Sequence, residues 1–119
     1  MKKAMLAASV LAVLAVTGPD QLTGKWETKP SPKGNITGVV FKEDQSFDGY
    51  VNKKPFTSGT YHLEDSTFEL VDNGCNGATG KYRIIFFSNN DSFRLRPIDD
   101  PCEERKNGMS KLVMGRVKQ

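Results

Sequence analysis

The segment "CNGATGKYRIIFFSNNDSFRLRPIDDPC", residues 75–102, decides the fold of this chain. Two runs rich in β-branched and aromatic residues, 80–87 and 92–98, flank the turn-forming sequence "SNND". In the second run, apolar Phe93 and Leu95 alternate with arginines, which is the period of a strand with one buried face. The segment therefore predicts an antiparallel β-hairpin, bracketed by the only two cysteines of the chain.

The same pattern extends outward from this hairpin in both directions. Short apolar-polar alternations are separated by turn formers, and "DDPCEERKNG", residues 99–108, is expected to be one such loop. The predicted strands are 22–29, 36–43, 46–52, 57–64, 67–72, 80–87, 92–98 and 110–117. Tight turns between neighbours favour an all-β fold, an eight-stranded antiparallel up-and-down barrel, because closure removes exposed strand edges.

Alternation also assigns the side chains that face the barrel interior. The predicted core is Trp26, Phe41, Phe47, Tyr61, Leu63, Phe68, Leu70, Tyr82, Ile84, Phe86, Phe93, Leu95, Leu112 and Met114. Eight strands enclose room for side chains or for one small ligand. The candidate ligand-binding residues near the open end are Phe41, Tyr61, Phe68, Tyr82, Phe86 and Phe93. Ile85 and Phe87 face outward and predict a covered face or a partner contact.

The first residues have the composition of a secretory signal peptide. Lys2 and Lys3 precede an apolar run, 4–16, which would span about 20 Å as a helix and is too short to cross a bilayer. A buried N-terminal helix is the alternative, but it would need a polar face. We therefore predict a signal peptide at 1–18, one domain at 19–119, a periplasmic or secreted location and no stable membrane insertion.

The charge balance argues against a nucleic-acid partner. The 17 Lys and Arg residues exceed the 14 Asp and Glu residues by three, and two of those lysines belong to the signal segment, which leaves an excess of one. The remaining charges alternate in sign along the chain and form no basic run. Nucleic-acid binding needs clustered positive charge, so we expect none.

Cys75 and Cys102 can be interpreted in three ways: they form a disulfide, they bind a metal together, or one is a nucleophile and the other has no role. Zinc needs about four close ligands, and neither cysteine lies in a C-x-x-C motif. A thiol nucleophile needs a base, and the only histidine, His62, is predicted to face outward. Export, the even count and the hairpin between the cysteines favour a disulfide. The carboxylates in 99–105 are read as a solvated acidic loop rather than a calcium site, so no metal is expected.

Several short motifs resemble the lipocalins and the wider calycin superfamily. Gly24-Lys25-Trp26 matches the G-x-W signature of the first strand. The second half is similar to small secreted lipocalin-like proteins of bacteria, and the matching residues in order are Gly59-Thr60-Tyr61, Cys75, Gly80-Lys81-Tyr82, Asp100, Cys102 and Arg105. The resemblance implies an exported calycin-type barrel. It also implies that an arginine packs on Trp26, with Arg116 as the first choice and Arg105 as its competitor.

Taken together, the sequence predicts an exported lipocalin-like binding protein, a monomer that takes a small apolar ligand, needs no cofactor and catalyses no reaction. No motif places a serine or an aspartate beside His62 for catalysis. The alternative is a protein-protein interaction module of the cell envelope, or an inhibitor of a secreted enzyme. It would act through loops such as "PSPKGN", 30–35, and "NGCNGA", 73–78.

Overall fold

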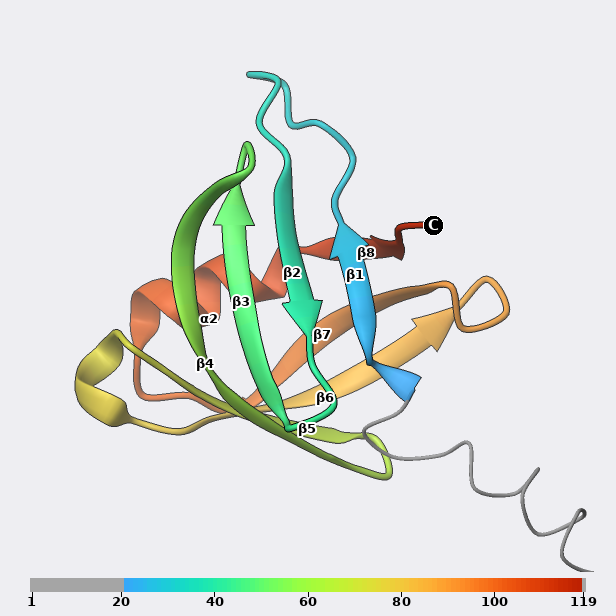
Figure 1. Ribbon diagram of the computed structural model, residues 1–119. Helices are drawn as coiled ribbons and strands as arrows, with labels where there is room; N and C mark the ends of the chain where they lie inside the picture. The colour runs from blue at the N-terminus through green and yellow to red at the C-terminus, as the bar shows by residue number, and fades with distance from the viewer. Residues whose placement is uncertain (1–20, 119) are drawn as a thin grey trace, which may run out of the picture.

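The chain closes into an antiparallel barrel, shown in Figure 1 of the computed structural model, which describes residues 21–118. The eight strands are β1 (Gly24–Glu27), β2 (Thr37–Phe41), β3 (Ser46–Val51), β4 (Lys54–Glu64), β5 (Thr67–Asp72), β6 (Gly80–Phe87), β7 (Ser92–Asp99) and β8 (Val113–Arg116). Each strand pairs with the next one along the chain, and β8 returns to β1 through the pair Trp26–Arg116. The predicted all-β barrel is confirmed.

The interior is filled by the side chains that alternation assigned to it. Of the predicted core, twelve residues are buried: Trp26, Phe41, Phe47, Tyr61, Leu63, Phe68, Leu70, Tyr82, Ile84, Phe93, Leu95 and Met114. Phe86 and Leu112 are only partly buried and pack against this cluster from its edge. Leu22, which the sequence did not single out, is also fully buried, and its backbone oxygen accepts a hydrogen bond from the Trp26 indole at 2.8 Å.

The turn between β3 and β4 is tighter than predicted. The sequence assigned 53–56 to a loop, but β4 begins at Lys54, and only Asn52 and Lys53 form the turn. Both have positive φ, +52° and +69°, as a type I′ hairpin turn requires. The register shifts between Gly49 and Tyr50, so that Phe56 lies at a β-bulge.

A helix, α2 (Glu103–Ser110), replaces most of the loop predicted at 99–108. It also shortens the last strand, which begins at Val113 rather than at 110. Its sequence, EERKNGMS, has almost no apolar period, which is why pattern reading missed it. Two carboxylates in the first turn favour the helix, and buried Arg105 together with Met109 anchors it to the barrel.

The predicted disulfide between Cys75 and Cys102 is confirmed. It joins a short 3-10 turn, η2 (Cys75–Gly77), to the residue before α2. Among residues 21–118, no helix is both long and apolar enough to cross a membrane. The predicted signal peptide at 1–18 lies outside the described residues.

Candidate functional site

Five of the six rings predicted to bind a ligand are buried in the interior cluster, and Phe86 packs against that cluster. All but Tyr82 form ring contacts within this set. Phe41 is the centre of the group: its ring centroid is 4.8 Å from that of Tyr61, 5.9 Å from Phe68 and 6.5 Å from Phe93. Phe86 lies 6.0 Å from Phe93 and is the least buried of the six. A ligand among these rings would have to displace side chains that are already packed, so their role in binding stays a prediction.

One end of the barrel is closed by Trp26 and Arg116. The guanidinium carbon of Arg116 lies 4.2 Å from the centroid of the Trp26 ring, so Arg116 rather than Arg105 is the arginine that packs on Trp26. The Arg116 guanidinium also donates to the backbone oxygens of Gln21 at 3.0 Å and of Thr23 at 3.3 Å. The Trp26 ring, the Arg116 guanidinium and the backbone of residues 21–23 therefore pack together and close this end of the barrel.

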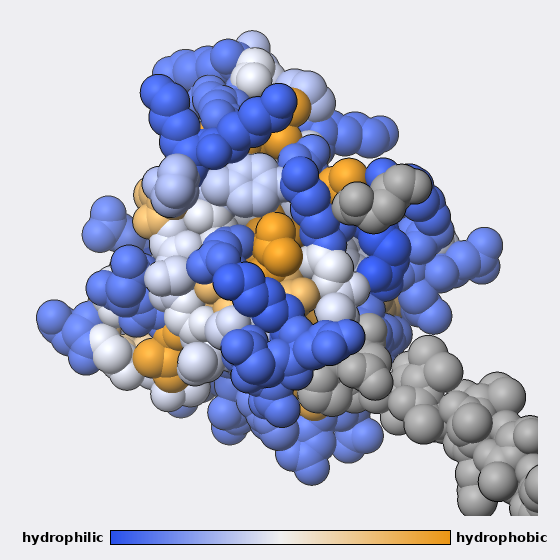
Figure 2. All heavy atoms as spheres, in the orientation of Figure 1, coloured by the Kyte–Doolittle hydropathy of each residue, from blue (hydrophilic) through white to orange (hydrophobic). Residues whose placement is uncertain are grey.

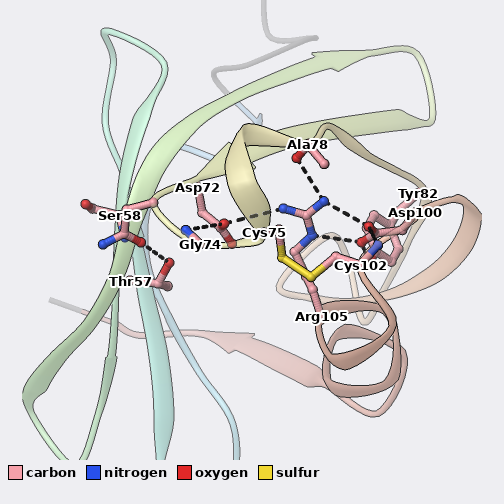
Figure 3. A network of polar contacts seen from close by, with 11 residues as sticks. Thr57, Ser58, Asp72, Gly74, Cys75, Ala78, Tyr82, Asp100, Cys102 and Arg105 are labelled. Atoms are coloured by element: carbon pink, nitrogen blue, oxygen red, sulfur yellow. Dashed lines mark hydrogen bonds and ion pairs between the residues drawn. A yellow bond between two sulfur atoms is a disulfide. The ribbon is translucent and has the colours of Figure 1, made fainter.

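The opposite end is closed by a buried polar network around Arg105 (Figure 3). The guanidinium donates to both oxygens of Asp100 at 2.8 Å, to the Ala78 backbone oxygen at 3.0 Å and to Asp72 at 3.4 Å. The Tyr82 hydroxyl donates to the same Asp100 carboxylate. Because the Cys75–Cys102 bond lies beside this network, α2, β6 and the η2 turn are tied together at one place.

The pKa values in this network follow from burial and charge. Burial alone would raise the pKa of Asp100, but hydrogen bonds from Arg105, Tyr82 and the Cys102 amide outweigh it and lower that pKa to about 2. Burial, reinforced by Asp100, raises the pKa of the Tyr82 hydroxyl well above its usual range. Asp100 is therefore a carboxylate and Tyr82 a neutral donor at physiological pH. A Cβ at Gly80 would crowd Asp100 and Arg105, which explains the glycine there.

A hollow lies on the outside of the barrel, over β1 to β4. It encloses about 630 Å³. The residues that line it are Lys25, Val40, Asp48, Gly49, Tyr50, Lys53, Pro55, Phe56, Thr57, Ser58 and Asn73. Figure 2 shows the same face, with an apolar area over β2 surrounded by hydrophilic side chains. The hollow combines aromatic surface with two lysines, a composition suited to an amphipathic ligand.

The floor of the hollow is built by Tyr50. Its ring lies across Gly38 of β2, where any Cβ would overlap the ring, and its hydroxyl donates to Glu27 of β1 at 2.5 Å. Burial, then the hydrogen bond and the charge of Glu27, raise the pKa of Tyr50 well above its usual range. Lys25 lies 5.7 Å from the centroid of this ring. These contacts hold the ring in one orientation.

Charge and apolar surface meet at the rim of the hollow. The Phe56 side chain is 73% exposed, the most exposed of the large hydrophobic residues among those described. Asp48 is the one carboxylate in the lining, and Lys42 neutralises it at 2.7 Å. The cations Lys25 and Lys53 are therefore available to an anionic group.

The remaining candidates carry no assembled chemistry within residues 21–118. His62 is exposed, as alternation predicted, and its ring nitrogen lies 3.4 Å from the exposed carboxylate of Glu64. In this part of the chain, no three His, Cys, Asp or Glu side chains are grouped so as to hold a metal ion. The predicted acidic loop at 99–105 is in fact partly internal, because Asp100 is buried in its pair with Arg105.

Sequence reasoning missed the outer hollow because its parts are scattered over four strands. Lys25, Val40 and Tyr50 read as ordinary outward residues, and the Phe56 bulge lay in a predicted loop. The available signals were Gly38 opposite an aromatic residue and an exposed phenylalanine after two lysines. Comparison with protein-family models and with curated proteins finds no match for this chain.

Proposed function

We propose that this is an exported, lipocalin-like binding protein without catalytic activity, which holds a small ligand in the outer hollow. The ligand class is an apolar or aromatic body that carries an anionic group. The observation that carries this proposal is the contrast between the interior, where the rings fill the space, and the hollow, where Phe56 and Tyr50 lie beside two lysines. The disulfide supports export, because such bonds persist in oxidising compartments.

Each part of the hollow has a role in this proposal. Phe56 and Val40 exclude water from the apolar body of the ligand, at roughly 25 cal/mol for each Å² that they cover. Tyr50, fixed by Gly38 and Glu27, offers a flat preorganised ring for stacking. Lys25 stands over that ring and pairs with the anionic group. Membership of the calycin superfamily is part of the proposal, and the closed eight-stranded barrel and the Trp26–Arg116 contact support it.

The test uses anilinonaphthalene sulfonate, which joins an aromatic body to an anion. We expect saturable binding to the folded protein, weakened about fivefold in Lys25→Gln and also weakened in Gly38→Ala, whose added Cβ displaces the Tyr50 ring. Lys81→Gln, on the outer face of β6, is the matched control and should bind normally. Cooperative thermal unfolding of each variant excludes dye uptake by a loosened core.

Two results would count against the outer hollow. The first is the absence of saturable binding by the folded protein. The second is binding that responds to Phe86→Leu, inside the barrel, and ignores Lys25→Gln. The second result would instead support the interior site that the sequence predicted.

A second candidate function is protein binding through the outer face of β6 to β8, either as an envelope interaction module or as an inhibitor of a secreted enzyme. Ile85, Arg94 and Val113 lie in one row across these strands, and Val113 is 52% exposed. Phe87, 40% exposed, adds a second apolar side chain to β6. A photocrosslinker at position 113 should give one discrete adduct in the native compartment, while the same group at the exposed Thr60 should give none.

A further inference from the structure

Two loops at one end of the barrel form a single rigid projection, at the top of Figure 1. We name it the basic tip: residues 29–35, between β1 and β2, and residues 52–56, which turn from β3 into β4. Asn52 joins the two loops. Its side chain accepts from the Ile36 amide and donates to the Asn35 side chain, both at 2.9 Å, and its amide donates to the Ile36 oxygen at 2.8 Å. The tip therefore presents its side chains without a large ordering cost.

The basic tip carries four exposed lysines: Lys29, Lys33, Lys53 and Lys54. None of them forms an ion pair with any residue from 21 to 118. The segments 28–41 and 49–61 contain no Asp or Glu. The linear charge pattern suggested alternating signs and no basic patch, but the barrel brings lysines from two separate loops together. The result is a local positive field at this end of the molecule.

Apolar and rigid residues are interleaved with these cations. The strongly exposed Phe56 comes two residues after Lys54, and Pro55 lies between these two residues. Pro30 and Pro32 are exposed beside Lys29 and Lys33. Lys53 also occupies, at φ +69°, a turn position that glycine or asparagine usually takes, so a charged side chain is kept there despite the backbone cost.

We propose that the basic tip docks reversibly on an anionic lipid surface. Lysines near such a surface are attracted to its negative charge, and an exposed aromatic ring between them partitions into the interface. A polyanion without an apolar part, such as heparin, would be bound by the lysines alone, whereas a lipid interface also takes up the exposed Phe56 ring. The basic tip shares Lys53, Pro55 and Phe56 with the lining of the outer hollow, but Lys29, Lys33 and Lys54 lie outside that lining. Variants of these three lysines therefore test the lipid contact separately from the ligand in the hollow.

The experiment is vesicle co-sedimentation with the protein in the form that its native host exports. The vesicles are phosphatidylcholine alone or mixed with phosphatidylglycerol. We expect binding only with the anionic lipid, and binding that falls as salt is raised. The triple variant Lys29→Gln, Lys33→Gln, Lys54→Gln should weaken it about fivefold for each lysine removed, about a hundredfold in all. Phe56→Ser should weaken it about tenfold through lost apolar contact.

The controls separate the tip from net charge and from the N-terminal residues. The matched triple variant Lys81→Gln, Lys111→Gln, Lys118→Gln removes the same number of positive charges elsewhere on the molecule. It should change vesicle binding by less than about threefold. All variants share one N-terminus, so only differences between them are compared. A Phe56→Trp variant should shift its emission to the blue on anionic vesicles, as an inserted ring would.

Three results would overturn the proposal. They are equal binding to neutral and anionic vesicles, an equal loss in the two triple variants, and no effect of Phe56→Ser together with tight binding to heparin. The last result would identify a general polyanion surface. Loss of dye binding in the hollow with retained vesicle binding would refute the proposed function alone, so the two proposals fail separately.

Discussion

The two ends of the barrel are each closed by one arginine, but the surroundings of the two side chains differ. Arg116 is 27% exposed, stacks on Trp26 and bonds to backbone oxygens, with Asp91 as an exposed ion-pair partner. Arg105 is 6% exposed and depends on the buried carboxylate of Asp100. At the Arg116 end, packing and backbone contacts remain when the charge is lost, so the charge contributes little to stability. At the Arg105 end, loss of the Asp100 partner leaves a buried charge unpaired, so the ion pair is essential there.

The variant with the largest expected effect on this difference between the two ends is Asp100→Ala. It leaves the Arg105 guanidinium buried without its main partner, and we expect the free energy of unfolding to fall by about 3–5 kcal/mol. Denaturant titration measures the loss. Asp99→Ala removes an exposed carboxylate from the neighbouring position and should cost little. Equal losses in the two variants would show that the buried pair does not hold this end.

The disulfide should have the next largest effect. Cys75 and Cys102 are 27 positions apart, and a loop of that length corresponds to about 3–4 kcal/mol in the chain-entropy account. We expect Cys75→Ser with Cys102→Ser to lower the free energy of unfolding by that amount, with the Trp26 end unchanged in near-ultraviolet circular dichroism. An unchanged free energy of unfolding would mean that the Arg105 network alone holds the loops.

Acid should distinguish the two ends. The pKa of Asp100 is lowered to about 2 in the folded protein, against about 3.9 when unfolded. Its contribution is fully present above the unfolded pKa and is lost as pH falls towards 2, with a total of roughly 2–3 kcal/mol. Asp100→Asn should flatten stability between about pH 4 and 2. An unaltered acid-unfolding curve in that variant would assign the pH dependence to other carboxylates.

The smallest expected effect is at the stacked end. Arg116→Met keeps an apolar stem over Trp26 and removes the charge, so we expect a loss of only about 0.5–2 kcal/mol. Thermal unfolding, compared with Arg96→Met on the exposed face of β7, measures it. A loss as large as that of Asp100→Ala would contradict the distinction between the two ends.

The barrel itself could be predicted from the sequence because alternation and turn formers are local signals. Phe93 and Leu95 face inward, as the opening segment predicted, and the cysteines at its two ends are bonded. Helix α2 could not be found in this way, because tertiary contacts of Arg105 and Met109 stabilise it rather than an apolar period.

The candidate sites were harder to predict than the fold. The hollow depends on Tyr50 lying over Gly38, and the basic tip depends on Asn52 joining two loops. These contacts link residues from different strands or loops, and a linear pattern carries no signal for them. Interior rings could be predicted from alternation, but alternation does not show that the rings fill the space that they surround.

The most direct test of the central claim, a filled interior with binding on the outside, is a two-dimensional amide NMR titration with anilinonaphthalene sulfonate. The account predicts shifts at Lys25, Val40, Tyr50 and Phe56, with the amides of Phe68 and Phe93 unmoved. Shifts concentrated at Phe68 and Phe93, with Lys25 and Tyr50 unmoved, would contradict it and place the ligand inside the barrel.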